Sequence, residues 1–592
     1  MKKKLIDVYS VETKVHPFPF VKAIKRYRIS FFKDDIIAAL SVALLAIPQS
    51  IAYSLLANLP TQAGILSAIF GAIFTGAFGS SKHLVAGPST GIAILIQTIL
   101  ASLMYTYFPD LVGLQKEKVI LDLLALLVFL VGIMQILFSL LNLGKLLQFV
   151  SRSVILGYFA GVGIAIIITQ LFSLFGISQT IQTPSALIKG LNFLQNLDKT
   201  NWIALVLGLL SLTFLIILRR KFKKLPNALI MLITISFFAY FLNFVLKDAN
   251  IQVPLLKDLG MPDIPVIKLT FPIKNFKYFK IIFTPSLAIT LLCILEVSSI
   301  SKGISTSSGQ KIRTNQEIFG GGISNFILSF FFSSMPASAS VSRTTLNFQA
   351  GAKTRIASIL SGIILACLVF FFWPFVKHIP ICALAAILIL MVVNVVEIRH
   401  VKLCFRATKA DGFVFLLTMI GCLVLRLDIA FFIGIILSIV FYLQKASVPH
   451  LVEYTFDKND KLILLTPSKQ THRTIRVIGI AGELFFAAVD LFQNTIQKII
   501  KEPDVKVIIF RLQNIYNVDA SICLSILKIN DFLKASSRYL LISGVTPEVY
   551  DIFQRSGVIK QLGSENVILC SEEKPQESTL KAFNRAKNLI NI

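Results

Sequence analysis

Long apolar runs alternate with short polar stretches over the first three quarters of the chain. Between residues 36 and 445 we count fourteen runs that are candidates for membrane-spanning helices, although several are shorter than the ~20 residues that a straight helix needs to cross a bilayer. The first seven cover residues 36–57, 60–78, 83–104, 119–141, 152–174, 201–219 and 226–246, and the second seven cover residues 281–301, 315–333, 336–350, 355–375, 379–396, 409–425 and 428–445. The pattern predicts an α-helical polytopic transmembrane domain over residues 36–447, preceded by a segment of residues 1–35.

The third and tenth runs are interrupted by small and polar residues. Ser80–Gly91 reads S-S-K-H-L-V-A-G-P-S-T-G, and Ser333–Leu346 reads S-S-M-P-A-S-A-S-V-S-R-T-T-L. Irregular backbone at membrane depth survives only where it is buried in protein or lines a cavity, and matched interruptions in two halves of a transporter indicate its binding site. Arg343 places a charge at bilayer depth, which costs about 2.5 kcal/mol or more and by default marks function. We expect two half-helices whose N-terminal N–H groups meet in one pocket with Arg343 and bind an anion.

Each half of this domain has an odd number of spans, so the second half sits upside down relative to the first. That is the inverted-repeat plan of many secondary transporters. Basic residues set the orientation, because cytoplasmic loops collect Lys and Arg. Lys22, Lys25, Arg26, Arg28 and Lys33 precede the first span and place the N-terminus in the cytoplasm, and most other basic loops then also fall inside. The exception is the loop 247–280, which is assigned outside although it has six lysines.

Composition agrees with a membrane protein and excludes other classes. The 592 residues are 55% hydrophobic and 15% charged, which excludes a soluble globular protein. The net charge of +27 does not indicate nucleic-acid binding, because basic cytoplasmic loops account for the excess. The seven cysteines form no C-x-x-C and the six histidines no H-E-x-x-H, so we expect no metal site, no cofactor and no enzymatic activity. No apolar core follows the charged N-terminus within thirty residues, so no cleavable signal peptide is expected.

After Leu443 the composition changes to charged, alternating sequence. Residues 448–592 are predicted to form a separate cytoplasmic α/β domain with a linker and a tail, because short strand and helix patterns alternate there. The predicted strands are 462–465, 475–480, 505–509 and 539–542, and the predicted helices are 491–500, 521–532 and 548–555. This region has neither G-x-G-x-x-G nor a P-loop.

The motifs together resemble the SulP family of anion transporters, which includes sulfate permeases, bicarbonate transporters, pendrin and prestin. The matching segments are A-I-P-Q-S-I-A-Y-S-L-L-A-N-L-P at Ala46–Pro60, G-P-S-T-G at Gly87–Gly91, S-R-S-V-I-L-G-Y-F-A-G-V-G at Ser151–Gly163, N-Q-E at Asn315–Glu317, Gly320–Asn325, and S-V-S-R-T-T-L-N-F-Q-A-G-A-K-T at Ser340–Thr354. The tail resembles the STAS domain that ends most members, through Gly482–Phe486, Asn517–Ser521 and Phe553–Val558.

This resemblance implies a core of spans 1–4 and 8–11 that moves against a gate of spans 5–7 and 12–14, in a homodimer. It places the anion between the third and tenth half-helices. The residues that it assigns to the anion site are Gln49, Tyr53, Pro88, Ser89, Thr90, Ser340, Ser342 and Arg343. Many members have an aromatic residue where this chain has Ser89. In the STAS-like domain the motif residues are Asp519 and Ser521, but Ala520 occupies the position that soluble relatives phosphorylate, which argues against a phosphorylation switch.

Each candidate also has a structural interpretation. Glu296, the only acidic residue of the eighth span, is assigned to proton or sodium coupling, or else pairs with Arg343 structurally. Arg343 in turn is an anion ligand or the partner of Glu296. Gln49 and Tyr53 bind the anion or pack between helices, and Ser340 and Ser342 are ligands or helix–helix contacts. Ser89 and Thr90 are expected to cap the third half-helix.

We therefore expect a multi-pass transporter in the inner membrane of a bacterium, with both termini in the cytoplasm. The favoured activity is symport of sulfate with protons by alternating access, with Glu296 as the coupling group. The runner-up is sodium-coupled bicarbonate symport. An uncoupled anion exchanger or channel, a dicarboxylate carrier and a sensor without flux remain as alternatives, and Arg343 disfavours a nucleobase carrier.

Overall fold

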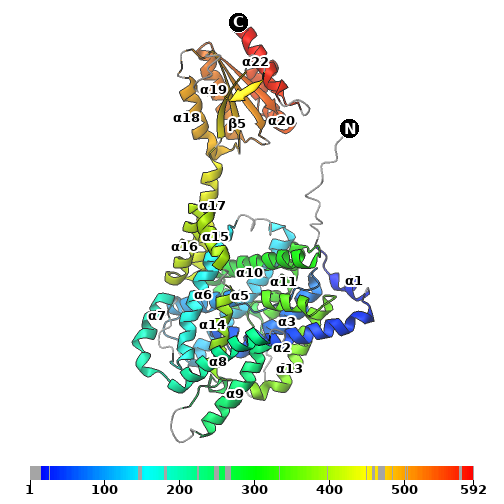
Figure 1. The fold of residues 1–592 in the computed structure, drawn as a ribbon, viewed down its shortest axis with the longest axis vertical. Coiled ribbons are helices and arrows are strands. Elements are labelled where there is room, and N and C mark those ends of the chain that lie inside the picture. Colours follow the sequence, from blue (N-terminus) through cyan, green and yellow to red (C-terminus); the bar gives the residue numbers. More distant parts are fainter. Residues whose placement is uncertain are drawn as a thin grey trace. The chain divides into compact units, whose positions relative to one another are not determined.

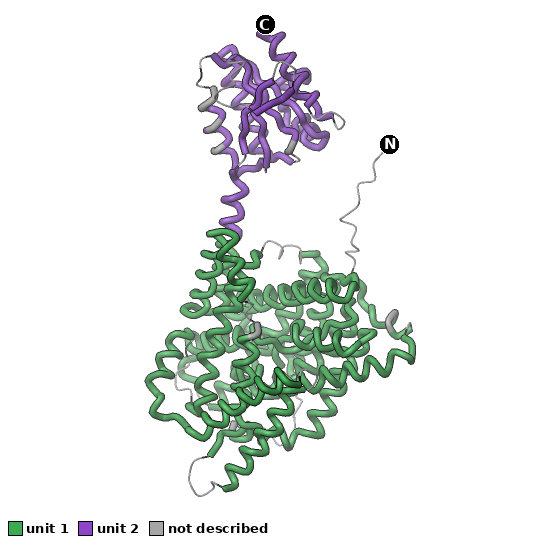
Figure 2. The backbone as a smooth tube through the Cα atoms, in the orientation of Figure 1, with its two compact units in different colours: residues 1–438 green, residues 439–592 purple. Residues whose placement is uncertain are grey.

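The computed structural model divides into two compact units, residues 1–438 and residues 439–592 (Figure 2). The structure describes residues 15–25, 27–111, 113–143, 150–178, 183, 185–222, 226–245, 252–259, 269–331, 334–395, 398–448, 450–456, 461–464, 474–482, 484–500, 502, 504–515, 517–571 and 576–590. Among the predicted features, residues 1–14, Arg26, residues 247–251 and 260–268 of the loop 247–280, Ser333 and Glu483 lie outside this set. Each unit is described below by itself.

Helices form at all fourteen predicted spans (Figure 1). They are α2 (Phe32–Leu56), α3 (Thr61–Phe78), α4 (Thr90–Tyr107), α5 (Gly113–Leu140), α6 (Arg152–Leu174), α8 (Trp202–Lys221), α9 (Asn227–Val245), α10 (Phe279–Ser308), α11 (Thr314–Leu328), α12 (Val341–Gln349), α13 (Ile356–Val376), α14 (Ile381–Val395), α16 (Lys409–Val424) and α17 (Leu427–Ala446). In the described chain, eleven segments are long and apolar enough to cross a membrane, and the shorter α11, α12 and α16 are not among them.

Two predicted boundaries are corrected. The third span was expected from residue 83 and the tenth from residue 336, but α4 begins at Thr90 and α12 at Val341. Proline explains the first shift, because Pro88 disfavours helical backbone at the residue before it. The residues ahead of each helix form the short strands β1 (Ala86–Gly87) and β2 (Ser338–Ala339) instead. The structure also has three short helices that the apolar pattern did not predict, α1 (Pro19–Lys25), α7 (Ala186–Gln195) and α15 (Ile398–Ala407).

The spanning helices pack in two groups. In one group α2 packs against α3, α12 and α13, while α5 packs against α10 and α11. In the other, α6 packs against α14 and α16, and α8 against α9 and α14. These groups correspond to the expected core and gate. Glycines bring the core helices close together, since a Cβ on Gly132 of α5 would overlap the backbone of Phe326 of α11.

The second unit is built on a six-stranded sheet of order β4-β3-β5-β6-β7-β8. Its strands are β3 (His450–Phe456), β4 (Leu462–Leu464), β5 (Ile475–Ala481), β6 (Val507–Asn514), β7 (Tyr539–Val545) and β8 (Val567–Leu569), and its helices are α18 (Val489–Ile500), α19 (Ala520–Ala535), α20 (Pro547–Arg555), α21 (Val558–Leu562) and α22 (Glu577–Leu589). The expected α/β alternation is present, with parallel pairing from β5 to β8. The predictions missed β3, β8, α21 and α22.

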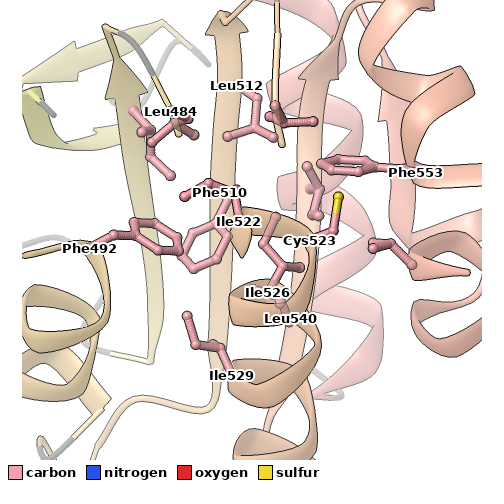
Figure 3. Close-up of a cluster of buried hydrophobic side chains, with 14 of the residues drawn as sticks. Leu484, Phe492, Phe510, Leu512, Ile522, Cys523, Ile526, Ile529, Leu540 and Phe553 are labelled. Atoms are coloured by element: carbon pink, nitrogen blue, oxygen red, sulfur yellow. The ribbon is translucent and has the colours of Figure 1, made fainter. Parts of the chain in front are cut away.

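Apolar side chains fill both faces of this sheet. On one face Phe492 of α18 and Phe510 of β6 meet edge to face beside Ile522 and Ile526 of α19, as Figure 3 shows. On the other face Phe583 of α22 packs among the inward residues of β5 and β6. A sheet covered on both faces in this way forms the core of an independent α/β domain.

Candidate functional site

The two interrupted segments pair with each other inside the membrane unit. β1 and β2 are antiparallel, with Ala86 opposite Ala339 and Gly87 opposite Ser338. The ladder is extended by a hydrogen bond from the Ser340 N–H to the Val85 carbonyl at 3.1 Å. Because α4 follows β1 and α12 follows β2, the two helices leave the ladder in opposite directions. Their N-termini, with unpaired N–H groups, therefore flank one short ladder.

Each half-helix is capped by a serine, as the sequence predicted for α4. The Ser89 hydroxyl accepts from the Ile92 N–H at 3.4 Å, and the Ser340 hydroxyl accepts from the Arg343 N–H at 3.5 Å. Thr90 is the first residue of α4. These caps use only part of the donors at each helix end, so the remaining N–H groups and the helix dipoles favour negative charge at this place.

Arg343 lies in the first turn of α12 and is 1% exposed. Its Nη2 donates to the Pro88 carbonyl at 2.7 Å, so the guanidinium of one half-helix is anchored to the segment that leads into the other. Within the described structure its Nε and Nη1 have no hydrogen-bond partner. A buried cation with two unused donors is costly unless an anion binds there. Gly87 makes the approach possible, because a Cβ at this position would collide with the guanidinium.

Glu296 of α10 reaches the opposite half-helix. Its Oε1 accepts from the Ser89 hydroxyl at 3.0 Å, and its Oε2 has no partner among the described residues. Gly91 packs beside the same carboxylate, since a Cβ there would lie 3.4 Å from Oε1, at van der Waals contact. No ion pair within 4.0 Å joins Glu296 to Arg343 in the described structure, since the two groups hold different partners. The two charged groups are therefore not in direct contact, but each acts electrostatically on the other, so the structural interpretation of the pair stays open.

The other predicted residues lie on α2 and α12. Gln49 Nε2 donates to the Ser342 hydroxyl at 3.2 Å, and Gln49 Oε1 has no partner in the described chain. The hydroxyls of Ser340 and Ser342 are 3.3 Å apart. Ser342 is exposed while Arg343 beside it is buried, so an anion that binds at Arg343 as predicted would enter at Ser342. Tyr53 is buried, and its hydroxyl donates to the sulfur of Met391 on α14 at 3.5 Å, which links the core to the gate.

Side chains outside the predicted set hold the two interrupted segments. Thr344 Oγ1 accepts from the Val85 N–H at 3.1 Å, and Asn347 Nδ2 donates to the His83 carbonyl at 2.9 Å. Asn325 of α11 holds the Ala337 backbone. The sequence signal at these residues is a polar side chain within or beside an apolar span, and only the structure shows which backbone groups it holds.

In the second unit, Asp519 has a structural environment. Its Oδ1 caps α19 by accepting from the Ile522 N–H at 3.0 Å, and its Oδ2 accepts from the Phe486 N–H at 2.7 Å. Ser521 lies half-buried in the first turn of α19. Burial raises the pKa of the Cys523 thiol and lowers the pKa of the Arg511 guanidinium. In the described part of the chain no group of three His, Cys, Asp or Glu side chains is arranged to hold a metal ion.

Comparison with known proteins bears on both units. Residues 32–418 match the model of the sulfate permease family, and residues 466–569 match the STAS domain. A chloroplastic sulfate transporter 4.1 of Arabidopsis thaliana is 27% identical over 93% of this chain and 80% of its own length. Sulfate transporter 1.1 of the same plant is 24% identical over 98% of this chain and 91% of its own.

Solved structures share the fold. A structure of SLC26A9 superimposes with a TM-score of 0.83 over 97% of this chain and 93% of its own, at 19% identity. The transmembrane domain of BicA, a cyanobacterial bicarbonate transporter, superimposes with a TM-score of 0.56 over 70% of this chain and 98% of its own, also at 19% identity.

Proposed function

The chain belongs to the sulfate permease family and carries a STAS domain, and from this premise we propose that it moves sulfate together with protons across a membrane by alternating access. It is a multi-pass membrane protein that transports anions, and members of its family are transporters rather than enzymes. The choice of sulfate, the proton as coupling ion and the mode of movement are the parts that we add.

The observation that carries the proposal is the buried guanidinium of Arg343. Two of its nitrogens have no partner in the described structure, and they lie where the N-termini of α4 and α12 come together. Sulfate has four acceptor oxygens and no donor in its dianionic form, so it fits a site made of donors. The Ser342 hydroxyl and the Gln49 amide lie beside Arg343 and extend the set of polar groups toward the exposed edge.

Glu296 explains why a proton accompanies the anion. Its Oε2 and the Gln49 Oε1 are buried acceptors without partners among the described residues, and neither can bind an oxygen of dianionic sulfate. Protonation of Glu296 converts one of these acceptors to a donor and removes a negative charge beside the incoming dianion. Sulfate and a proton then enter the site together, and release of one weakens the binding of the other.

Uptake of labelled sulfate into proteoliposomes tests this proposal. We expect an inward proton gradient to accelerate uptake by the wild type, and Glu296→Gln to abolish that acceleration, because glutamine cannot release a proton. The matched control is Glu117→Gln at the exposed start of α5, which should respond to the gradient as the wild type does. Equal gradient responses in both variants would refute the role of Glu296, and an absence of sulfate uptake by the wild type would refute the choice of substrate.

Sodium-coupled bicarbonate symport is the second candidate. Bicarbonate carries its own hydroxyl, which can donate to Gln49 Oε1 or Glu296 Oε2 without protonation of the carboxylate. The Ser298 hydroxyl on α10, which also has no partner in the described chain, would be a sodium ligand close to Glu296. Uptake of labelled bicarbonate driven by a sodium gradient, with no sulfate uptake, would favour this candidate. An uncoupled exchanger or channel would move the anion without response to either gradient.

We also propose the setting in which the transporter works. The basic residues that precede α2 support a cytoplasmic N-terminus, and an even number of spans then leaves the STAS domain in the cytoplasm of a bacterium, under the inner membrane. We propose that the chain acts as a homodimer, and that the STAS domain, in which Asp519 is a helix cap, serves folding, assembly or regulation rather than a phosphorylation switch. Nucleotide binding by this domain remains an alternative role.

A further inference from the structure

The segment that leads into α12 has little regular structure of its own. Residues 334–337 connect α11 with the two-residue strand β2 and are buried. Buried backbone must find hydrogen-bond partners. The Met335 N–H donates to the Ala63 carbonyl of α3 at 3.3 Å, and both backbone groups of Ala337 are bound by the side chain of Asn325. Asn325 therefore takes the place of a neighbouring strand for Ala337.

The geometry of this contact is a two-point clamp. The Ala337 N–H donates to Asn325 Oδ1 at 2.7 Å, and Asn325 Nδ2 donates to the Ala337 carbonyl at 3.0 Å. The second hydrogen of Nδ2 is directed to Gln135 Oε1 of α5 at 2.7 Å, which fixes the orientation of the amide. Asn325 and Gln135 are both 0% exposed. Every donor of the Asn325 side chain is thus used, and only the carboxamide shape can supply both halves of the clamp.

The clamp rests on a rigid part of the core. Gly132 and Gly322 let α5 and α11 approach so closely that a Cβ on either would overlap the facing helix. Gln135 lies one turn after Gly132, and Asn325 one turn after Gly322. The α5–α11 contact is therefore a fixed reference against which Asn325 positions Ala337.

Ala337 is directly followed by the residues of the anion site. Ser338 pairs with Gly87, Ser340 caps α12, and Arg343 holds the carbonyl of Pro88. A shift of Ala337 would move Arg343 relative to Glu296, which is held by α10 and Ser89. The segment before α4 is tied to α12 as well, because Thr344 and Asn347 of α12 hold Val85 and His83.

We propose that Asn325, oriented by Gln135, is the positioning residue of the anion site: it sets the distance between the donors of α12 and the Glu296 carboxylate without touching the anion. This inference rests on the proposed function, since it concerns the same site. It accounts for a fully buried amide in an apolar helix, which would otherwise be costly. Loss of the clamp leaves the helices in place but releases the segment that carries the ligands.

The test compares sulfate uptake by purified full-length variants in proteoliposomes. Asn325→Ala removes the clamp, and Gln135→Met removes only the bond that orients it. The control is Gln316→Ala on the same helix, whose amide also holds backbone groups, those of His16 and Phe78, but away from the anion site. We expect Asn325→Ala to raise the KM for sulfate about tenfold or more, Gln135→Met to raise it by less, and Gln316→Ala to leave it unchanged.

Thermal unfolding of each variant separates positioning from folding. We expect Asn325→Ala and Gln316→Ala to lower the melting temperature by similar amounts, because each removes side-chain bonds to buried backbone. An unchanged KM in Asn325→Ala, or an equal rise in the control, would overturn the proposal. If Asn325→Ala does not fold, the same criteria apply to Gln135→Met. An unchanged KM for sulfate in that variant, or an equal rise in Gln316→Ala, would then overturn the proposal. Failure of the proposed function is recognised separately, in a wild type that takes up no sulfate, and the KM comparison is then made with bicarbonate.

Discussion

Arg343 uses one corner of its guanidinium to hold the backbone and leaves its other donors unused in the described chain. One nitrogen of its guanidinium holds the Pro88 carbonyl, while Nε and Nη1 have no partner in the described chain. A guanidinium is planar and presents its donors in a fixed fork, so anchoring one corner also fixes where the free edge points. The residue therefore joins the two half-helices and offers a preorganised edge to an oxyanion.

Replacement by lysine tests this use of shape. Arg343→Lys keeps a positive charge but replaces the fork by a single ammonium group, which cannot hold Pro88 and the anion in the same geometry. We expect the KM for sulfate to rise about tenfold, and Arg343→Gln, which removes the charge, to reduce uptake further. Initial rates over a range of sulfate concentrations measure both. Wild-type affinity in the lysine variant would show that charge alone is sufficient.

At the scale of single residues, the sequence predicts candidate site residues where the side chain is chemically unusual for its surroundings. Arg343 and Glu296 are charges within apolar spans, and the structure brings both to the half-helices. Tyr53 lies beside the site but donates to Met391. Asn325 and Gln135 could not be assigned, because their role depends on which backbone groups of a distant segment come within reach. The assignment of the predicted residues to anion binding remains a prediction.

The two half-helices are joined as one element by the ladder of β1 and β2. The ladder has only two residue pairs, so close packing around it matters more than its own hydrogen bonds. Gly87 has Arg343 directly against it, and Gly71 of α3 approaches Gly87 from another side. A side chain at Gly87 would displace the guanidinium.

Gly87→Ala should therefore abolish uptake. The added methyl group collides with the Arg343 guanidinium, which then loses its place beside Pro88. The matched control is Gly303→Ala near the end of α10, where a Cβ meets nothing within 4 Å and alanine is the better helix former. We expect the control to transport like the wild type and to be equally or more stable. Sulfate uptake and the melting temperature are measured for both variants. Wild-type uptake by Gly87→Ala would contradict the packing described.

Element positions could be predicted where hydrophobicity alone decides them. The eleven longer spans of the described chain were found because each must cover the apolar thickness of a bilayer, whereas α11, α12 and α16 fall on shorter predicted runs. The starts of α4 and α12 were misplaced, since the residues before them are buried yet extended, and their partners lie more than 200 residues away in the chain. The helices α7 and α15 were missed because amphipathic segments of ten residues give no long apolar run.

The helices of the membrane unit pack in two groups, which the proposed function treats as two moving bodies. Within the core, buried carboxylates form hydrogen bonds between separate elements. Glu317 of α11 accepts from the N–H of Ser81. Asp35 of α2 accepts from the N–H groups of Lys353 and Thr354. Across the boundary to the gate, the Tyr53 hydroxyl donates to Met391 Sδ, which is a weak acceptor. Strong bonds within the core and a weak polar contact at its border suit a core that moves without deforming.

Alternating access predicts that the exposed edge of the proposed anion site faces first one side of the membrane and then the other. Ser342 is exposed and Ser338, four residues earlier, is 1% exposed, so cysteines at these positions form a matched pair. With the exposed Cys367 and the partly exposed Cys570 replaced by serine, we expect a membrane-impermeant thiol reagent to modify Ser342→Cys but not Ser338→Cys. Sulfate should slow the reaction, because it occupies the donors beside Ser342.

The side of reaction distinguishes a transporter from a pore. In a transporter the site is open to one side at a time, so reversing the proton gradient across the proteoliposomes should shift the reaction of Ser342→Cys from one face of the membrane to the other. In an uncoupled channel the site is continuous with both solutions, and the reagent would react from both faces at rates that do not depend on the gradient. That result would remove alternating access from the proposed function while leaving the anion site in place, since the site depends on α4 and α12 and not on the movement of the core.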